Sequence, residues 1–284
     1  MPCRGTSVTG MEPTPLSQSG PDDADLFSVH GRTAVVTGGS RGIGAMIARG
    51  LARDGAQVVI ASRKADQCRA AAEAINASGV RGHCTATPAD LSSPEGCQRL
   101  AAWLAEHHHS VDILVNNAGT TWGAPLEAFP TAGWTKVLGT NLIAPFDLTV
   151  GILPLLRRAG RADRPARVIN IGSVDGINAP LWENYSYSAG KAGLHMLTRH
   201  LAKRLAAEHI TVNAIAPGPF LTDMLGHVAA DQGVETELLA RVPLGRYGLA
   251  GDIVGAVRFL ASRAGAYVTA AVIPLDGGIT GCPG

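Results

Sequence analysis

Short runs of Val and Ile alternate along the chain with stretches in which apolar residues recur at helical spacing, beginning near residue 31. Apolar runs of about four to eight residues are typical of strands that are buried on both faces. The runs predict strands over residues 33–37, 57–61, 80–87, 111–115, 167–171, 211–216 and 271–275. The helical spacing predicts helices over residues 43–53, 64–77, 94–106, 141–158, 187–208 and 250–262.

This alternation predicts one α/β domain over residues 29–284. Strands that are separated by helices pair in parallel, and right-handed crossovers place helices on both faces of the sheet. The expected fold is therefore a doubly wound parallel sheet, which binds ligands at the carboxyl ends of its strands. Residues 1–28 are rich in Pro, Ser, Thr, Gly and Asp and show no periodicity, so we expect a flexible tail with no secretory signal.

Composition narrows the range of partners. The 284 residues include 24 Lys and Arg and 23 Asp and Glu, and this balance argues against nucleic acid as a partner. No apolar run approaches the roughly 18 residues that cross a membrane. The five cysteines include no C-x-x-C pair, so we expect no disulfide framework, no metal site and a cytoplasmic location. The three histidines at 107–109 are interpreted as a solvated helix end.

A glycine-rich turn, Thr37-Gly-Gly-Ser-Arg-Gly-Ile-Gly44, links the first predicted strand to a helix. Glycine lets a diphosphate approach the backbone, and a helix N-terminus offers unpaired N–H groups with partial positive charge. The turn therefore predicts a dinucleotide-binding cradle, with an ordinary tight turn as the alternative. The predicted cradle residues are Gly38, Ser40, Arg41, Gly42, Ile43 and Gly44.

The end of the second strand indicates which coenzyme is preferred. The sequence Ala61-Ser62-Arg63-Lys64 lacks the acidic residue that would favour a free ribose 2′-hydroxyl. Arg63, helped by Arg41, can instead pair with a 2′-phosphate, and Ser62 is expected to contact the same group. We therefore expect NADP(H) rather than NAD(H), unless Arg63 simply lies in solvent at the strand end.

Two more turns are candidates for coenzyme contact. Asp90, followed by Leu91, comes after the third strand, where a carboxylate can accept a hydrogen bond from the adenine amino group. A local turn or helix-capping role for Asp90 is the alternative. Asn117, Ala118 and Gly119 follow the fourth strand and can line the coenzyme, although a purely structural turn would use the same residue types.

The candidate chemistry lies after the fifth strand. Ser173 follows that strand, and Tyr187 and Lys191 share a helix face at positions i and i+4, a spacing that exposed pairs also show. With a ketone beside a reduced nicotinamide, Ser173 can donate a hydrogen bond to the carbonyl oxygen and Tyr187 can supply the proton. A free phenol has a pKa near 10, and an ammonium at ~4 Å would lower it. We therefore expect Lys191 to lower the pKa of Tyr187 and to hold the nicotinamide ribose.

Two neighbouring residues complete this constellation. Asn141 is expected at the start of its helix, holding a water that connects Lys191 to solvent. Tyr185 has Ala189 rather than a lysine at i+4, so we assign it to the substrate pocket.

In order along the chain, these motifs resemble those of the short-chain dehydrogenase/reductase superfamily over residues 30–280. The resemblance is carried by Thr37–Gly44, Asn116–Gly119, Asn141, Ser173, Tyr187-x-x-x-Lys191 and Pro217-Gly218. It implies a seven-stranded Rossmann fold, a Ser–Tyr–Lys–Asn catalytic set and usually a homotetramer, or else a homodimer. It also implies coenzyme contacts from Tyr187, Lys191, Ile215, Pro217, Gly218 and Thr222, and a substrate lid over residues 219–237.

Three segments, residues 114–124, 153–158 and 166–174, look similar to NADPH-dependent 3-oxoacyl-[acyl-carrier-protein] reductases of the rhamnolipid-biosynthesis type. Two features depart from that pattern: Asp175 after Ser-Val, and Trp182-Glu-Asn before the first tyrosine. The wall of the substrate pocket is therefore expected to differ. The N-terminal extension is not a feature of the family.

Three functions remain open. Apolar candidates for the pocket, Trp122, Trp182 and Phe220, favour a 3-oxoacyl thioester or a similar hydrophobic ketone as substrate. A polyol or sugar-acid dehydrogenase would use the same scaffold. A non-catalytic dinucleotide sensor is the third possibility, but it would not need Ser173, Tyr187 and Lys191 together.

Overall fold

Seven parallel strands form one sheet in the order β3-β2-β1-β4-β5-β6-β7. The computed structural model describes residues 25–180, 182–222 and 232–282, so most of the predicted tail lies outside the described residues. The sheet order changes direction between β1 and β4, and doubly wound sheets bind ligands at such a point. The strands are β1 (Thr33–Thr37), β2 (Gln57–Ser62), β3 (His83–Pro88), β4 (Ile113–Asn116), β5 (Ala166–Ile171), β6 (Ile210–Pro217) and β7 (Val272–Leu275).

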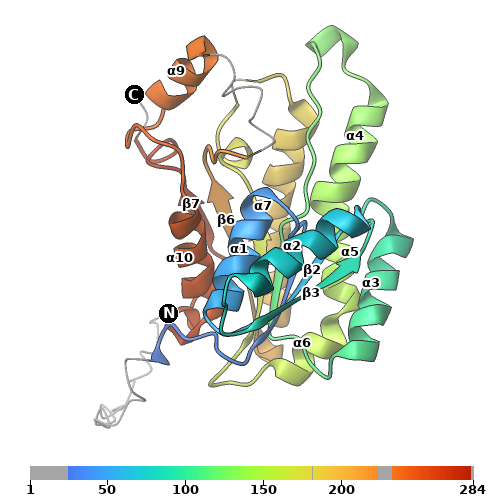
Figure 1. Cartoon of the computed structure of the whole chain (residues 1–284). Coiled ribbons are helices and arrows are strands. Elements are labelled where there is room, and N and C mark those ends of the chain that lie inside the picture. Colours follow the sequence, from blue (N-terminus) through green and yellow to red (C-terminus); the bar gives the residue numbers. More distant parts are fainter. Residues whose placement is uncertain (1–24, 181, 223–231, 283–284) are drawn as a thin grey trace, which may run out of the picture.

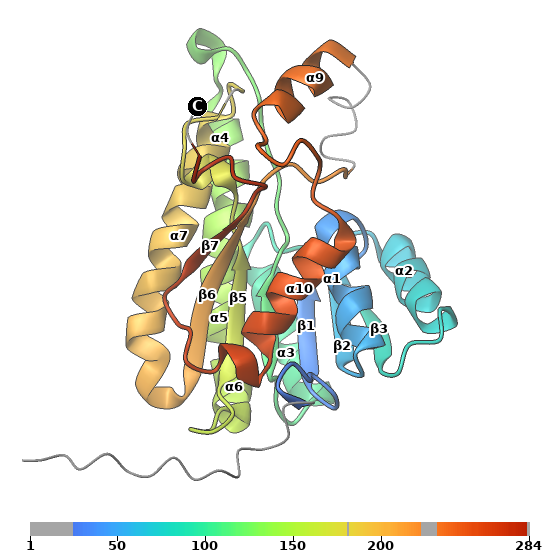
Figure 2. The same cartoon turned by 90° about the vertical axis from the view of Figure 1, so that its left-hand side faces the viewer.

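Helices cover both faces of this sheet (Figures 1 and 2). One core cluster joins the sheet to α1, α2 and α10, and a second joins its other face to α3, α5, α6 and α7. In both views α4 and α9 extend beyond the carboxyl ends of the strands. The helices are α1 (Gly42–Arg53), α2 (Ala65–Ala77), α3 (Pro94–His107), α4 (Thr131–Leu138), α5 (Ala144–Gly151), α6 (Leu153–Ala159), α7 (Tyr185–Leu205), α9 (Gln232–Ala240) and α10 (Ala250–Ala261).

The predicted doubly wound fold is confirmed, and the burial of its strands explains why the pattern was informative. Every residue of β5 and of β6 is buried, as a strand covered on both faces requires. Three strands begin later than predicted, and the largest difference is at β3, which begins at His83 instead of residue 80. The left-handed backbone of Gly79 and the packing of Gly82 against Ala56 keep the preceding residues in a turn.

The helix predicted over residues 141–158 is wrong in outline. The structure has α4 over 131–138, a π-helical turn η3 (Gly139–Ile143), then α5 and α6. Because Gly133 and Gly139 disfavour a helix, this region gave no helical signal upstream of residue 141, and tertiary packing decides its conformation. In the described part of the chain, no single helix combines the length and apolar character needed to cross a membrane; two stretches joined at a 59° bend do so only together.

Candidate functional site

The glycine turn after β1 is packed too closely to accept side chains at two of its glycines. Gly38 has a φ of +65°, and a Cβ there would lie 2.9 Å from Nδ2 of Asn117. A Cβ on Gly44 would overlap the carbonyl oxygen of Gly38. The turn therefore presents bare backbone at the point where β1 passes into α1, as a diphosphate cradle needs.

Two local features of this turn fit an anionic ligand. The first turn of α1 contains no acidic residue, and the side chain of its N-cap residue, Arg41, makes no capping hydrogen bond. A helix N-terminus that has free backbone N–H groups and no acidic side chain attracts anions. At the end of β2, the buried Oγ of Ser62 has no hydrogen-bond partner in the described part of the chain, and a bound polar group would satisfy it. Together the residues here fit a phosphorylated dinucleotide.

Asn117 and Asp90 make bonds within the protein. Nδ2 of Asn117 donates to the carbonyl oxygen of Thr37 at 2.8 Å, which ties β4 to the glycine turn. Oδ1 of Asp90 accepts from the backbone N and from the Oγ of Ser92, at 3.1 and 2.8 Å, and these bonds lower the pKa of the Asp90 carboxyl. The turn role of Asp90 is thus confirmed, and its contact with adenine stays a prediction.

Ser173, Tyr187 and Lys191 meet at the carboxyl end of β5. Nζ of Lys191 lies 5.6 Å from the centre of the Tyr187 ring and donates to the carbonyl oxygen of Ile171 at 2.6 Å. The Ser173 side chain lies close enough to the Tyr187 hydroxyl to lower its pKa, and its Oγ accepts from the backbone N of Asp175 at 3.1 Å. The hydroxyl groups of Ser173 and Tyr187 therefore lie near each other beside the end of β5.

Burial controls the ionisation of this pair. It raises the pKa of Tyr187 to about 12; the hydrogen bond with Ser173 acts in the opposite direction, and the charge of Asp175 raises the value further. Burial also lowers the pKa of Lys191 to about 8, and Asp175 opposes that change. The expected lowering of the phenol pKa is therefore wrong: burial raises it, and Lys191, whose Nζ lies over the ring and bonds to Ile171, is not among the causes of the shift.

Asn141 lies within the π-helical turn η3, not at the start of a helix as predicted. Its amide makes two hydrogen bonds with the backbone of Thr120, each 2.9 Å long. A Cβ on Gly119 would lie 3.5 Å from Oδ1 of Asn141 and 3.8 Å from Nζ of Lys191, so these three residues are neighbours. Single π-helical turns are frequent at functional sites, and this one carries Asn141 toward Lys191. The water expected at Asn141 stays a prediction.

A buried polar chain beneath this site escaped the sequence analysis. Nδ2 of Asn116 donates to Oδ1 of Asn170 at 2.9 Å and to Oγ1 of Thr149 at 3.4 Å. Nδ2 of Asn170 in turn donates to Oγ1 of Thr198 at 2.8 Å. This series of hydrogen-bonded side chains joins β4, β5, α5 and α7. A usable signal was present, since asparagines inside apolar strands need partners from neighbouring elements.

The base of the predicted lid is well anchored. Gly218 N donates to the Leu275 carbonyl at 3.0 Å, and a Cβ on Gly42 would lie 3.4 Å from Cγ2 of Thr222. Thr222 therefore lies beside the cradle. Phe220, predicted to line the substrate pocket, is 2% exposed and packs against Gly248, where a Cβ would overlap its ring. It also lines the cavity described next, and its contact with a substrate stays a prediction. The predicted lid's residues 223–231 lie outside the described residues.

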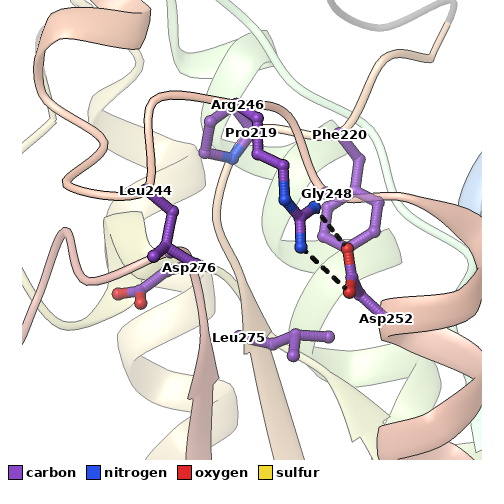
Figure 3. A pocket seen from close by; sticks show the side chains of 9 residues that line it. Pro219, Phe220, Leu244, Arg246, Gly248, Asp252, Leu275 and Asp276 are labelled. Carbon is purple, nitrogen blue, oxygen red and sulfur yellow. Dashed lines mark hydrogen bonds and ion pairs between the residues drawn. The ribbon is translucent and has the colours of Figure 1, made fainter.

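Beneath this anchor lies a cavity of about 100 Å³. Figure 3 shows the Arg246 guanidinium pointing toward Asp252, with the Phe220 ring beside this pair and Leu275 below it. Arg246 and Asp252 pair at 2.7 Å, and Oδ2 of Asp252 also accepts from Leu249 N at the start of α10. These contacts join the segment after α9 to the start of α10.

Aromatic side chains cluster where the segment before α4 meets the start of α7, the helix that carries Tyr187, and this cluster is called the rim of the site. Trp182 is exposed, and the half-buried Trp122 lies under Nζ of Lys136 at 5.2 Å. Tyr185 packs edge-on against Phe129 with ring centres 5.4 Å apart, and its hydroxyl donates to Glu183 at 2.9 Å. The rim is therefore apolar over much of its surface.

Comparisons with known proteins agree with this geometry. The family model for short chain dehydrogenases matches residues 32–233. The chain is 51% identical over 253 residues, 89% of its length and 97% of the relative's, to a rhamnolipids biosynthesis 3-oxoacyl-[acyl-carrier-protein] reductase of Pseudomonas aeruginosa. It is 36% identical over 262 residues, 90% of its length and 97% of the relative's, to a gluconate 5-dehydrogenase of Gluconobacter oxydans.

A solved structure described as the Pseudomonas aeruginosa RhlG/NADP active-site complex has a TM-score of 0.87 against this chain. The match covers 90% of this chain and 99% of the other, at 50% identity. Because the family model, a half-identical relative and the sheet order all agree, the chain belongs to the short-chain dehydrogenase family.

Proposed function

We propose that this protein is an NADPH-dependent oxidoreductase that reduces a ketone, a 3-oxoacyl thioester or a similar hydrophobic ketone, to a secondary alcohol. The observation that carries the proposal is the meeting of Ser173, Tyr187 and Lys191 at the strand end next to the glycine turn. The similarity to a 3-oxoacyl-[acyl-carrier-protein] reductase and to an NADP complex supports it.

The predicted coenzyme contacts stand as part of this proposal. When bound, NADPH supplies the hydride. The backbone of the glycine turn and the α1 N-terminus would hold its diphosphate, and Ser62, Arg63 and Arg41 would hold the 2′-phosphate. Further contacts are proposed from Asp90, Leu91, Asn117, Ala118, Gly119, Pro217, Gly218 and Thr222.

The protein's own part in the reaction follows from its protonation states. A phenol whose pKa is raised to about 12 stays protonated near neutral pH, so Tyr187 is ready to give its proton to the carbonyl oxygen. Ser173 would donate a hydrogen bond to the same oxygen and fix its position. Lys191 would hold the nicotinamide ribose, and Asn141 would connect Lys191 to solvent.

A substrate panel tests the proposed substrate class. We expect kcat/KM with NADPH to be at least about tenfold higher for a 3-oxoacyl thioester than for a keto-sugar acid. The rim offers apolar surface for an acyl chain, and each methylene group that is buried there makes binding more favourable. Initial rates of NADPH oxidation measure this. A preference for the keto-sugar acid would support the gluconate dehydrogenase alternative, and coenzyme binding without turnover of any ketone would support a sensor.

We also propose that the chain forms a homotetramer, or a homodimer, through an exposed apolar face. This face consists of Ile143, Phe146, Val150 and Met196 on η3, α5 and α7. The first three recur at helical spacing, and α7 approaches η3 closely at Gly193. Exposed apolar patches of this kind mark interaction sites.

Phe146→Glu is expected to lower the mass in solution toward that of the single chain, because association would bury the introduced charge. Multi-angle light scattering measures the mass. Leu126→Glu, which changes an exposed leucine outside this face, is the control and should leave the mass unchanged. An unchanged mass for Phe146→Glu would show that the face is not the interface.

The location of the protein and its domain boundaries complete the proposal. We propose a cytoplasmic location, in keeping with the free thiols of Cys68, Cys84 and Cys97. We also propose that residues 1–28 form a tail to a single reductase domain over residues 29–284, since the family model begins at residue 32.

A further inference from the structure

Asp175 connects the serine and the tyrosine of the site. It lies in the short turn η4 (Val174–Gly176), and its backbone N donates to the Oγ of Ser173 at 3.1 Å. Its Oδ2 accepts from Nδ2 of Asn184 at 3.2 Å. The carbonyl oxygen of Asn184 accepts from the backbone N of Tyr187 at 2.8 Å. A continuous series of hydrogen bonds therefore runs from Ser173 through Asp175 and Asn184 to Tyr187.

Asn184 depends on Asp175 for its orientation. It is the N-cap residue of α7 and is 7% exposed, yet its side chain makes no capping bond. Its Oδ1 has no hydrogen-bond partner within the described residues, so the bond to Asp175 is the one that orients the amide. The η4 turn that carries Asp175 packs closely against α7: a Cβ on Gly176 would lie 2.9 Å from the His195 ring.

The charge of Asp175 acts on both ionisable groups of the site. The half-buried carboxylate raises the pKa of Tyr187 and opposes the lowering of the pKa of Lys191. The other group on the buried face of α7 is His195, whose pKa burial lowers to about 4, so it is neutral at working pH; Arg199 lies one turn further along. Among the described residues, no further charge contributes to the shift at Tyr187, and β5 and the η3 turn offer only Ile171 and the neutral Asn141 here.

We propose that Asp175 is a positioning residue: through its hydrogen bonds with Ser173 and Asn184 it aligns Tyr187 with Ser173 for transfer of the phenol proton to the carbonyl oxygen. The inference rests on the proposed reductase function. It deepens that function by explaining a residue that departs from the pattern of similar reductases.

Two variants test this positioning role. Asp175→Asn removes the charge, and a flip of the Asn184 amide preserves the hydrogen bond between the two side chains. Asn184→Ala removes that hydrogen bond and keeps the charge. Asp163→Asn, at a carboxylate that is 85% exposed, is the matched control for loss of one negative charge.

The measurements are kcat and kcat/KM from pH 6 to 10 for ketone reduction with NADPH and for oxidation of the product alcohol with NADP⁺. For Asp175→Asn, which keeps a hydrogen-bonding side chain at this position, we expect kcat in each direction to stay within about threefold of wild type, because the alignment of Tyr187 is kept. For Asn184→Ala, we expect kcat to fall about tenfold at every pH with no change in the shape of the profile.

Each result supports or overturns the proposal. A fall in kcat of about tenfold or more for Asp175→Asn, with Asp163→Asn unchanged, would overturn the proposal, because this variant keeps the hydrogen bond to Asn184. Wild-type kcat for Asn184→Ala would overturn the role of the hydrogen bond. Quenching of Trp fluorescence by NADPH confirms that each variant is folded. Wild-type turnover of the ketone is measured first, so a failure of the reductase function is distinguished from a failure of this inference.

Discussion

Tyr187→Phe is expected to lower kcat for ketone reduction by at least about 10³-fold while leaving NADPH affinity within about threefold. The substitution removes one hydroxyl and keeps the ring that packs beside Nζ of Lys191. Without the phenol, the carbonyl oxygen has Ser173 to donate a hydrogen bond but no group to deliver a proton. Initial rates and titration of Trp fluorescence with NADPH measure the two quantities.

The same helix supplies the matched control. Tyr185→Phe also removes one phenol hydroxyl, in that case from a hydrogen bond with Glu183 at the rim. We expect it to change KM for the ketone more than kcat. If the two variants lost kcat equally, the assignment of Tyr187 as the proton donor would be wrong.

Arg63→Asp is expected to reverse the coenzyme preference. The change replaces a cation with an anion at the end of β2, next to the unpartnered Oγ of Ser62. A charge-assisted bond to a 2′-phosphate is lost and repulsion replaces it, so kcat/KM with NADPH should fall at least about 100-fold. NADH has no 2′-phosphate, so its kcat/KM should change by less than about threefold or improve. Kinetics with both coenzymes at fixed ionic strength measure this.

Arg69→Asp makes the same change of charge on the exposed side of α2, where Arg69 pairs with Asp66 at 2.6 Å. It should leave the ratio of NADPH to NADH activity unchanged. A similar drop in both variants would mean that net charge, and not a contact at Arg63, sets the preference.

Most of the fold could be predicted from the sequence because the central strands are buried on both faces. The residues of β5 and β6 are all buried, and their apolar runs therefore marked the sheet. The turns at the strand ends then placed Ser173 next to Tyr187 and Lys191 without knowledge of any distance. Strand ends were less certain at β3, where the glycines before His83 decide the start.

What the sequence could not supply depends on tertiary packing. The π-helical turn around Asn141 arises from contacts and has no periodic signal. The burial of Phe220 could not be predicted, because an apolar residue after a strand looks the same in the sequence whether it is exposed or packed in the core. The raised pKa of Tyr187 required the extent of burial and the position of Asp175, which no spacing along the chain reveals.

The four side chains that connect β4, β5, α5 and α7 have a consequence for how this protein can change. The side chains of Asn116, Asn170, Thr149 and Thr198 are hydrogen-bonded to one another, so an apolar replacement at one position leaves a buried donor or acceptor at the next without a partner. An unpaired buried group lowers the free energy of unfolding by about 1–3 kcal/mol, a large part of the stability of a domain. Descendants of this sequence should therefore keep the quartet intact or exchange it as a block, and libraries that vary one position at a time would miss the viable replacements.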